Sequence, residues 1–261
     1  MFSAELEQYD TLVKSYREEV VAKMNANDYK KHEEIFFSCH SCGIEGNTFT
    51  VDDTRALFEQ QLGFYPVGRS LYECQEMADH FAAYEYTFSH LDSPLDIHLV
   101  KEINKLVTLH TLPYKAPEAI PGEFTTVDMA AGDTIFGNHE QLVASVPRLL
   151  EATQQAMTAG NTHPLIVAAR FHGYFIYLHP FRDGNGRTAR LLSNWILAKS
   201  DLPHLIITRD QREKYIAALK AIRKEGTDEH LIHFFVHTAI QSMTSELEQK
   251  KKHSTLTTFL F

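Results

Sequence analysis

The most informative part of the chain is residues 179–190, which read His179-Pro180-Phe181-Arg182-Asp183-Gly184-Asn185-Gly186-Arg187-Thr188-Ala189-Arg190. Pro180 follows an apolar helical pattern that reaches Leu178. The two glycines allow a tight turn that exposes consecutive backbone N–H groups. Apolar residues at helical spacing then resume at Leu191. The stretch is therefore expected to be a loop between two helices. The positive end of the second helix suits an anion.

The side chains of this loop match the needs of a reaction on a nucleotide phosphate. Arg187 and Arg190 lie one helical turn apart, so two guanidinium groups can grip a polyphosphate. Asp183 is a hard oxygen donor that suits Mg²⁺. His179 can accept a proton near neutral pH and is the candidate general base. Neither a Walker A sequence nor a kinase glycine-rich loop occurs, which argues against the common ATPase and kinase reactions.

Composition indicates an ordinary globular protein. The chain has 261 residues, of which 44% are hydrophobic and 23% charged, and no apolar run reaches the ~20 residues that span a bilayer. The formal net charge of −9 disfavours a nucleic-acid surface. The acidic N-terminus and the odd number of cysteines (Cys39, Cys42 and Cys74) favour a reducing, cytoplasmic location. No second Cys or His pair completes a zinc site with Cys39 and Cys42.

Apolar residues three and four positions apart predict helices through most of the chain. The first covers residues 6–24, and the second covers about 29–45 and ends at Gly46. Later starts are marked by Thr50 with Asp53, by Ser70 with Glu73, and by Ser93 before Pro94. Further patterns cover 139–158, 163–178, 185–199, 209–224 and 228–248. The lysine run at 250–252 is expected to be a frayed helix end.

Residues 111–138 break the helical pattern, because they hold three of the nine prolines and short β-like pieces at 124–129 and 134–136. Residues 130–133 are expected to form the turn of a small hairpin. The expected fold class is therefore all-α, a helical bundle with one β-hairpin.

Residues 179–190 resemble, at every fixed position, the signature of the Fic (Fido) family, HPF-x-[DE]-GNGR-x-x-R. The hairpin region, the His163-Pro164 pair and Arg212 are similar to the same core. The resemblance implies a Fic-type bundle over about residues 95–240, with the hairpin as a flap. Residues 1–94 are then an N-terminal helical region, and residues 241–261 a C-terminal helix end and tail.

Members of this family with an intact motif typically transfer AMP from ATP to a protein hydroxyl and release pyrophosphate. The resemblance implies that His179 deprotonates a Ser, Thr or Tyr hydroxyl of the target and that Asp183 binds Mg²⁺. It implies an ATP site made of Asp183, Gly184, Asn185, Gly186, Arg187, Thr188, Ala189, Arg190 and Tyr215. In that site Arg187 holds the α/β region, Arg190 the γ-phosphate, and Tyr215 lies near the adenine. Val127, Met129, Gly132 and Ile135 would align a target segment by strand addition.

Three positions bear on the nucleotide and the reaction. Kinase-type relatives such as the Doc toxin carry Lys where this chain has Gly186, so adenylylation is favoured over phosphorylation. Close relatives carry Tyr and Asn where this chain has Ile216 and Arg223. Transfer of another nucleotide moiety, such as UMP, therefore stays open.

Residues 41–47 resemble the family's inhibitory motif, [ST]-x-x-x-E-[GN], and the string from Ile44 through Asn47 to Thr50 is similar to relatives. The resemblance implies an inhibitory helix at about residues 29–46, with Ser41 and Glu45 in the motif. Glu45 would pair with Arg190, the guanidinium expected to hold the γ-phosphate, and so misalign the α-phosphate.

The expected function is an autoinhibited protein adenylyltransferase that uses ATP and Mg²⁺ and acts on a target protein and on itself. Neither a nucleic acid nor a membrane is an expected partner, and family members often form homodimers. A de-AMPylase in which Glu45 positions a hydrolytic water is an alternative. A nucleotide-sensing regulator without turnover is another, although an intact His179 argues against it.

Overall fold

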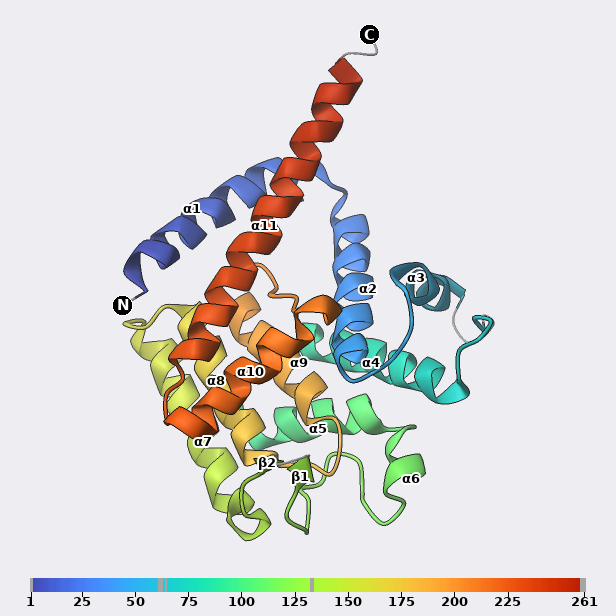
Figure 1. Cartoon of the computed structure of the whole chain (residues 1–261), viewed down its shortest axis with the longest axis vertical. Helices are drawn as coiled ribbons and strands as arrows, with labels where there is room; N and C mark the ends of the chain where they lie inside the picture. The colour runs from blue at the N-terminus through green and yellow to red at the C-terminus, as the bar shows by residue number, and fades with distance from the viewer. Residues whose placement is uncertain (1, 61–62, 64, 132–133, 259–261) are drawn as a thin grey trace.

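The computed structural model describes residues 2–60, 63, 65–131 and 134–258, which are mostly helical (Figure 1). The α-helices are α1 (Ser3–Glu19), α2 (Ala26–Ile44), α3 (Val51–Gln60), α4 (Leu71–Ser89), α5 (Ile97–Thr108), α6 (Leu112–Lys115), α7 (Leu142–Ala159), α8 (Pro164–Leu178), α9 (Asn185–Lys199), α10 (Arg212–Glu225) and α11 (Glu229–Thr258). Short 3-10 turns are η1 (Val21–Lys23), η3 (His139–Gln141) and η4 (Arg209–Gln211). The prediction of an all-α bundle with a small hairpin is confirmed.

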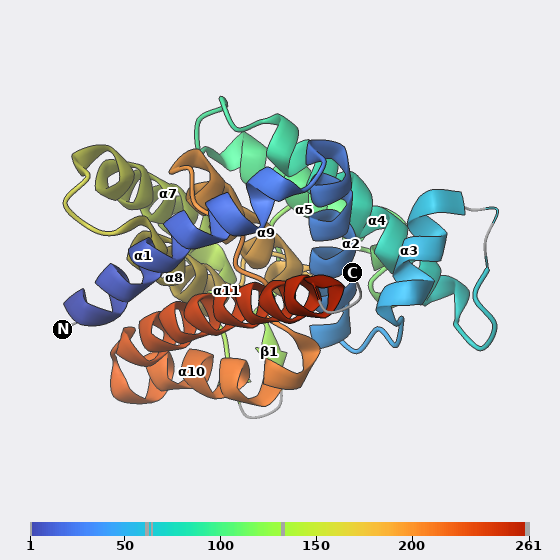
Figure 2. The ribbon, with the colours of Figure 1, turned by 90° about the horizontal axis from the view of Figure 1, so that it is seen from above.

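The core of the bundle is built around α9, which contacts α2, α4, α5 and α8. Its residues from Arg187 to Leu197 are all buried, including Trp195. A helix that is buried on every side belongs at the centre of a fold. Around it, α1 and α11 pack against each other, with α10 along α11 (Figure 2). The loop between α8 and α9 is therefore attached to the most rigid part of the molecule.

The predicted helix starts are mostly confirmed. Ser70 and Glu73 form a reciprocal capping box at the start of α4, and Thr50 and Asp53 exchange similar bonds at α3. The prediction at Ser93-Pro94 is wrong, because α5 begins at Ile97 and Asp96 caps it by accepting from Leu99 N. The reason is tertiary: residues 93–96 turn so that Leu95 enters the core, at 2% exposure.

The hairpin is shifted from its predicted position. The strands β1 (Ala130–Ala131) and β2 (Thr134–Ile135) pair antiparallel, Ala130 with Ile135. Ala130 is therefore in a strand and not in the turn. The predicted strand at 124–129 is wrong: Phe124 instead bridges Phe181 of the loop. This contact ties the segment before the flap to the loop.

The C-terminal end also differs from its prediction. Helix α11 continues to Thr258, so residues 250–252 are helical. Lys250 Nζ donates to Val20 O, 3.1 Å away at the end of α1, a long-range contact that local sequence could not reveal. Helix α6 was not predicted. Within the described ranges, no helix combines the length and apolar character needed to cross a membrane.

Candidate active site

The loop between α8 and α9 is closed by its own residues. Asn185 braces it, because its side chain accepts from Phe181 N at 3.0 Å and donates to Phe181 O at 2.7 Å. Gly184 begins α9 with a φ of 76°, and a Cβ there would lie 2.6 Å from Thr108 Cγ2. The positive φ and this close contact therefore require glycine at position 184. Both polar atoms of the Asn185 side chain bond the backbone of Phe181, so the side chain is occupied within the loop. Any phosphate contact by this residue would come from its backbone N–H.

His179 ends α8 in the left-handed conformation, with a φ of 51°. Its ring stacks on Phe136, with centroids 3.7 Å apart. Within the described residues, Nδ1 is buried and has no hydrogen-bond partner. Burial lowers the pKa of His179 to about 4. The imidazole is therefore neutral at pH 7 and can take a proton from a bound hydroxyl.

Glu45 lies at the C-terminal end of α2, opposite the start of α9. Its Oε1 is 2.7 Å from Arg190 NH2, the contact expected from the resemblance. A Cβ at Gly186 would overlap Glu45 Oε1, so the glycine lets the carboxylate rest on the loop. Burial alone would raise the pKa of Glu45, but Arg190 and Arg187 outweigh burial and lower it. The carboxylate is ionised at neutral pH, and its side chain keeps 37% exposure.

Three arginines of α9, η4 and α10 bind carbonyls at this end of α2 and just beyond it. Arg190 NH2 donates to Ser41 O at 2.7 Å, and its Nε donates to Ser41 Oγ at 3.0 Å. Arg212 Nε donates to Ile44 O at 2.7 Å, and Arg209 NH2 to Phe49 O at 2.6 Å. Carbonyls at a helix C-terminus lack partners within the helix and carry partial negative charge. The three guanidinium groups therefore hold this end of α2 in place.

Arg187 is placed differently from the expected phosphate clamp. Its side chain is 1% exposed, and NH1 pairs with Glu76 Oε1 at 2.9 Å. NH2 lies 3.5 Å from Asp183. Glu76 lies on α4 and was not found from the sequence. A charged residue among the apolar positions of a helix was the available signal. Arg187 is therefore tied into a buried ion pair, whereas Arg190 faces Glu45.

Asp183 Oδ2 lies 3.0 Å from Lys115 Nζ, a partner that the sequence did not suggest. Arg187 and Lys115 outweigh the effect of burial and keep the pKa of Asp183 below its usual value, so this carboxylate is ionised. Its side chain is 22% exposed. No cluster of three His, Cys, Asp or Glu ligands exists in the described part of the chain. A divalent ion here would therefore need ligands from a nucleotide.

The other predicted nucleotide contacts are mostly buried. Thr188 and Ala189 are fully buried, and Thr188 Oγ1 accepts from Asn104. Tyr215 is 2% exposed, and its hydroxyl bonds His172 Nε2 at 2.8 Å. These side chains shape the core under the loop and do not line an open surface. A pocket of about 270 Å³ lies nearby between the flap, α8 and α10, with Phe136, Gly173, Ile176, Tyr177, Ile216 and Arg223 in its lining.

The flap presents two of its four predicted residues to solvent. Val127 is 46% exposed and Ile135 is 74% exposed. Met129 Sδ lies 3.3 Å from Arg182 NH1, and Gly132 falls outside the described residues. Arg223 NH1 donates to Ile135 O at 2.7 Å, which ties the flap to α10.

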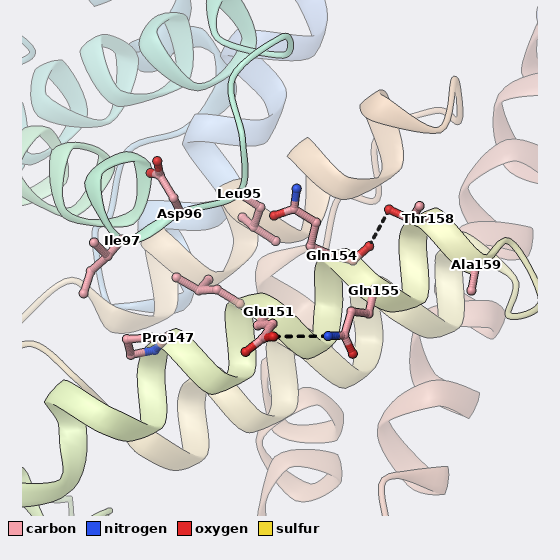
Figure 3. Close-up of a pocket in the computed structure, with 10 residues that line it drawn as sticks. Leu95, Asp96, Ile97, Pro147, Glu151, Gln154, Gln155, Thr158 and Ala159 are labelled. Atoms are coloured by element: carbon pink, nitrogen blue, oxygen red, sulfur yellow. Dashed lines mark hydrogen bonds between the residues drawn. The ribbon is translucent and has the colours of Figure 1, made fainter.

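A second, larger pocket of about 730 Å³ lies between the start of α5 and α7 (Figure 3). Its described lining holds neither histidine nor arginine: Leu95, Asp96, Ile97, Pro147, Leu150, Glu151, Gln154, Gln155, Thr158 and Ala159. The predicted site residues His179, Asp183 and Arg190 do not line this pocket. The thiols of Cys39 and Cys42 are buried, and each lies near a backbone carbonyl: Cys39 near Phe49 O and Cys42 near Glu76 O.

Comparison with known proteins agrees with this geometry. The model of the Fic/DOC family matches residues 94–197. Protein adenylyltransferase Fic of Drosophila grimshawi is 30% identical over 240 residues, which are 88% of this chain and 48% of that protein. The Drosophila melanogaster protein of the same name is 31% identical over 219 residues, 81% of this chain and 43% of that protein. The chain thus spans about half the length of these curated relatives.

Solved structures share the fold. A Fic domain containing signaling protein from Bacteroides thetaiotaomicron superposes with a TM-score of 0.80 at 22% identity, over 95% of this chain and 97% of that one. Fic-1 from C. elegans gives 0.76 at 23% identity, over 96% and 74%. Together with the complete loop signature and its position between α8 and α9, these matches show that the chain belongs to the Fic/DOC family.

Proposed function

We propose that the protein is an autoinhibited protein adenylyltransferase. It transfers AMP from ATP to a Ser, Thr or Tyr hydroxyl of a target protein or of itself and releases pyrophosphate. The relatives named protein adenylyltransferase support this activity. The observation that carries the proposal is the placement of His179 at the end of α8, with a buried Nδ1 that has no partner among the described residues, close in sequence to Arg190 of α9, whose guanidinium lies 2.7 Å from Glu45.

His179 acts as the general base of the transfer. The hydroxyl oxygen bonds to the α-phosphorus while its proton passes to the imidazole, and the bond from this phosphorus to the pyrophosphate oxygen breaks. The neutral ring and its unpartnered Nδ1 suit this role. The stack on Phe136 fixes the orientation of the ring. The flap residues Val127, Met129, Gly132 and Ile135 align the target strand, and the exposure of Val127 and Ile135 supports this role.

Asp183 holds Mg²⁺ when ATP is bound. The residues fit this ion, because Asp183 offers an ionised, partly exposed carboxylate, the hard oxygen ligand that Mg²⁺ prefers, and Lys115 at 3.0 Å is the cation that Mg²⁺ would displace. Bound Mg²⁺ would neutralise negative charge on the phosphate oxygens. The backbone from Gly184 to Gly186 and the side chain of Arg190 bind the phosphates, with Arg187 behind them as the partner of Asp183.

Glu45 inhibits the transfer by occupying Arg190. The carboxylate rests above Gly186, so a γ-phosphate would meet negative charge where the guanidinium should receive it. Ser41 supports the contact by accepting from Arg190 Nε. In this proposal residues 1–94 carry the inhibitory segment and residues 95–240 the catalytic core. Three free, buried thiols support a reducing cytoplasmic location. A homodimer stays a prediction.

The reverse reaction is a second candidate. Because Glu45 is ionised and only partly buried, its carboxylate can orient a water toward an AMP–protein bond. Incubating wild-type protein with a pre-modified target and measuring the loss of AMP separates the two functions.

The test of the proposed function is intact-mass spectrometry with labelled ATP and, in parallel, labelled UTP. Glu45→Gly should gain AMP on itself and wild type much less, while the double variant Glu45→Gly/His179→Ala should gain none and still bind ATP. Transfer by the double variant at the rate of Glu45→Gly would overturn the role of His179. Preferred labelling by UTP would overturn the choice of nucleotide.

A further inference from the structure

Helix α4 presents three polar side chains to residues 38–48 of the chain: Glu73, Glu76 and His80. The spacing of three and four residues places them on one face of the helix. His80 is fully buried and Glu76 is 3% exposed. Buried polar groups are costly unless they are hydrogen-bonded. Their partners therefore indicate what this face is for, and we call the three residues the α2 seat.

His80 bridges two serines of α2 that lie one helical turn apart. Nδ1 lies 3.0 Å from Ser38 Oγ, and Nε2 lies 2.9 Å from Ser41 Oγ. Ser41 Oγ also accepts from Arg190 Nε at 3.0 Å. Burial lowers the pKa of His80 far below its usual value, so the ring is neutral. One ring nitrogen then donates and the other accepts, which fixes the rotation of α2 about its axis.

Glu76 and Glu73 bind the chain on the other side of Glu45. Asn47 Nδ2 donates to Glu76 Oε2 at 2.9 Å and to Glu73 O at 3.0 Å. Thr48 N donates to Glu73 Oε1 at 2.8 Å. The other oxygen of Glu76 pairs with Arg187 at 2.9 Å. The segment is thus fixed four residues before Glu45 and two residues after it.

The contacts of Ser41 and Asn47 with α4 matter because Glu45 itself is weakly constrained. It is the C-cap of α2, and Gly46 follows it with a φ of 108°. Its side chain is 37% exposed. A partly exposed ion pair alone is a weak constraint on a helix end. We infer that the contacts before and after Glu45 in the chain bring its carboxylate over Gly186 to Arg190.

We propose that His80 and Glu76 are positioning residues of the inhibition: they set the rotation and depth of α2 so that Glu45 meets Arg190. The inference rests on the proposed function for its consequence in catalysis, but not for the placement of α2. His80 acts through its hydrogen bonds to Ser38 and Ser41, not through Gly186 or His179. Its loss therefore raises activity, whereas damage to a purely structural residue lowers it.

The test compares His80→Phe with wild type by hydrogen–deuterium exchange and by self-modification. Phenylalanine keeps a ring beside Phe37, whose ring centroid is 5.6 Å from that of His80, but removes both hydrogen bonds. Amides of residues 38–48 should exchange about tenfold faster, while those of α8 keep their rates. Loss of two buried hydrogen bonds should raise self-modification at least about fivefold. In the Glu45→Gly background the same change should add less than about twofold, because inhibition is already absent.

Thr87→Val is the matched control, because Thr87 is fully buried on the same face of α4 and its hydroxyl bonds Ala83 O within the helix. It should leave exchange at 38–48 and self-modification unchanged. If His80→Phe folds poorly, Ser38→Ala removes one of the two bridges with little change of volume and should give a smaller effect of the same sign.

Unchanged exchange at 38–48 in both His80→Phe and Ser38→Ala overturns the inference. An equal rise in activity with and without Glu45 also overturns it. If exchange rises at 38–48 but Glu45→Gly transfers no nucleotide, the placement by the α2 seat is supported and the proposed function fails.

Discussion

Glu76→Gln gives a demanding test of the buried charges under the loop. The substitution keeps the shape of the side chain and removes one charge. Both partners of Glu76 are donors: Arg187 NH1 at 2.9 Å and Asn47 Nδ2 at 2.9 Å. A glutamine has one oxygen and one NH₂ group, so it cannot accept from both. One donor therefore meets another donor in either orientation.

The magnitude follows from the burial of Arg187. Its side chain is 1% exposed and that of Glu76 is 4% exposed, so the guanidinium loses its main counter-charge without access to water. Breaking a buried ion pair by removing one partner costs about 3–5 kcal/mol. Asp183 remains 3.5 Å from Arg187, which places the expected cost near the lower figure, about 3 kcal/mol. The corresponding fall in Tm is about 6–12 °C for a chain of this size.

Urea unfolding followed by circular dichroism measures this cost. Glu123→Gln is the matched control, because Glu123 pairs with Lys101 at 2.6 Å but the two side chains are 56% and 30% exposed. Such a surface pair contributes about 0–1 kcal/mol. Equal losses in the two variants, or a loss below about 1 kcal/mol for Glu76→Gln, would refute the reasoning about buried charge.

Three further predictions concern nucleotide binding and catalysis. Glu45→Gln should tighten ATP binding about 5- to 30-fold by calorimetry, because Arg190 loses a contact worth about 1–2 kcal/mol; an unchanged Kd would contradict this. Lys115→Met should lower the Mg²⁺ concentration at half-saturation of nucleotide binding severalfold, because Lys115 Nζ competes for Asp183; an unmoved midpoint speaks against it. Because burial lowers the pKa of His179 to about 4, its neutral form persists above that pH. The rate of Glu45→Gly should stay level from pH 8 to about 5 and fall below, and a break near the ordinary value of 6.5 would contradict this.

Much of the fold was predictable, because it follows from helical periodicity and local capping. The helices from α7 to α10 lie close to their predicted ranges, α11 begins one residue from its predicted start, and the Ser70–Glu73 cap is present. The errors arose where distant residues decide the local structure. Burial of Leu95 moved the start of α5 to Ile97, and the contact of Lys250 with Val20 extended α11. Local sequence does not contain such information.

The site was predictable in its loop and not in its surroundings. His179, Asp183 and Arg190 stand in one contiguous signature, whereas Glu76 and Lys115 are separated from their oppositely charged partners, Arg187 and Asp183, by more than sixty residues. In sequence, a glutamate on a helix usually indicates a solvated residue, and Lys115 is indeed 50% exposed although it pairs with Asp183. The burial of both charges of the Glu76–Arg187 pair becomes evident only when the helices are packed.

The positions of Gly186 and Glu45 together explain why a single short segment can govern this site. Because position 186 has no side chain, the Glu45 carboxylate can lie against the start of α9 beside Arg190. In the proposed function a phosphate takes the same place, since a helix N-terminus and a guanidinium suit either anion. The choice between them then depends on how firmly α2 is held and not on the loop. Hydrogen bonds to α4 favour the carboxylate, and we expect any event that lifts residues 38–48 from α4 to make the same loop available to a nucleotide. Under the proposed function, inhibition and phosphate binding are two uses of one anion site, and strengthening the first is expected to weaken the second.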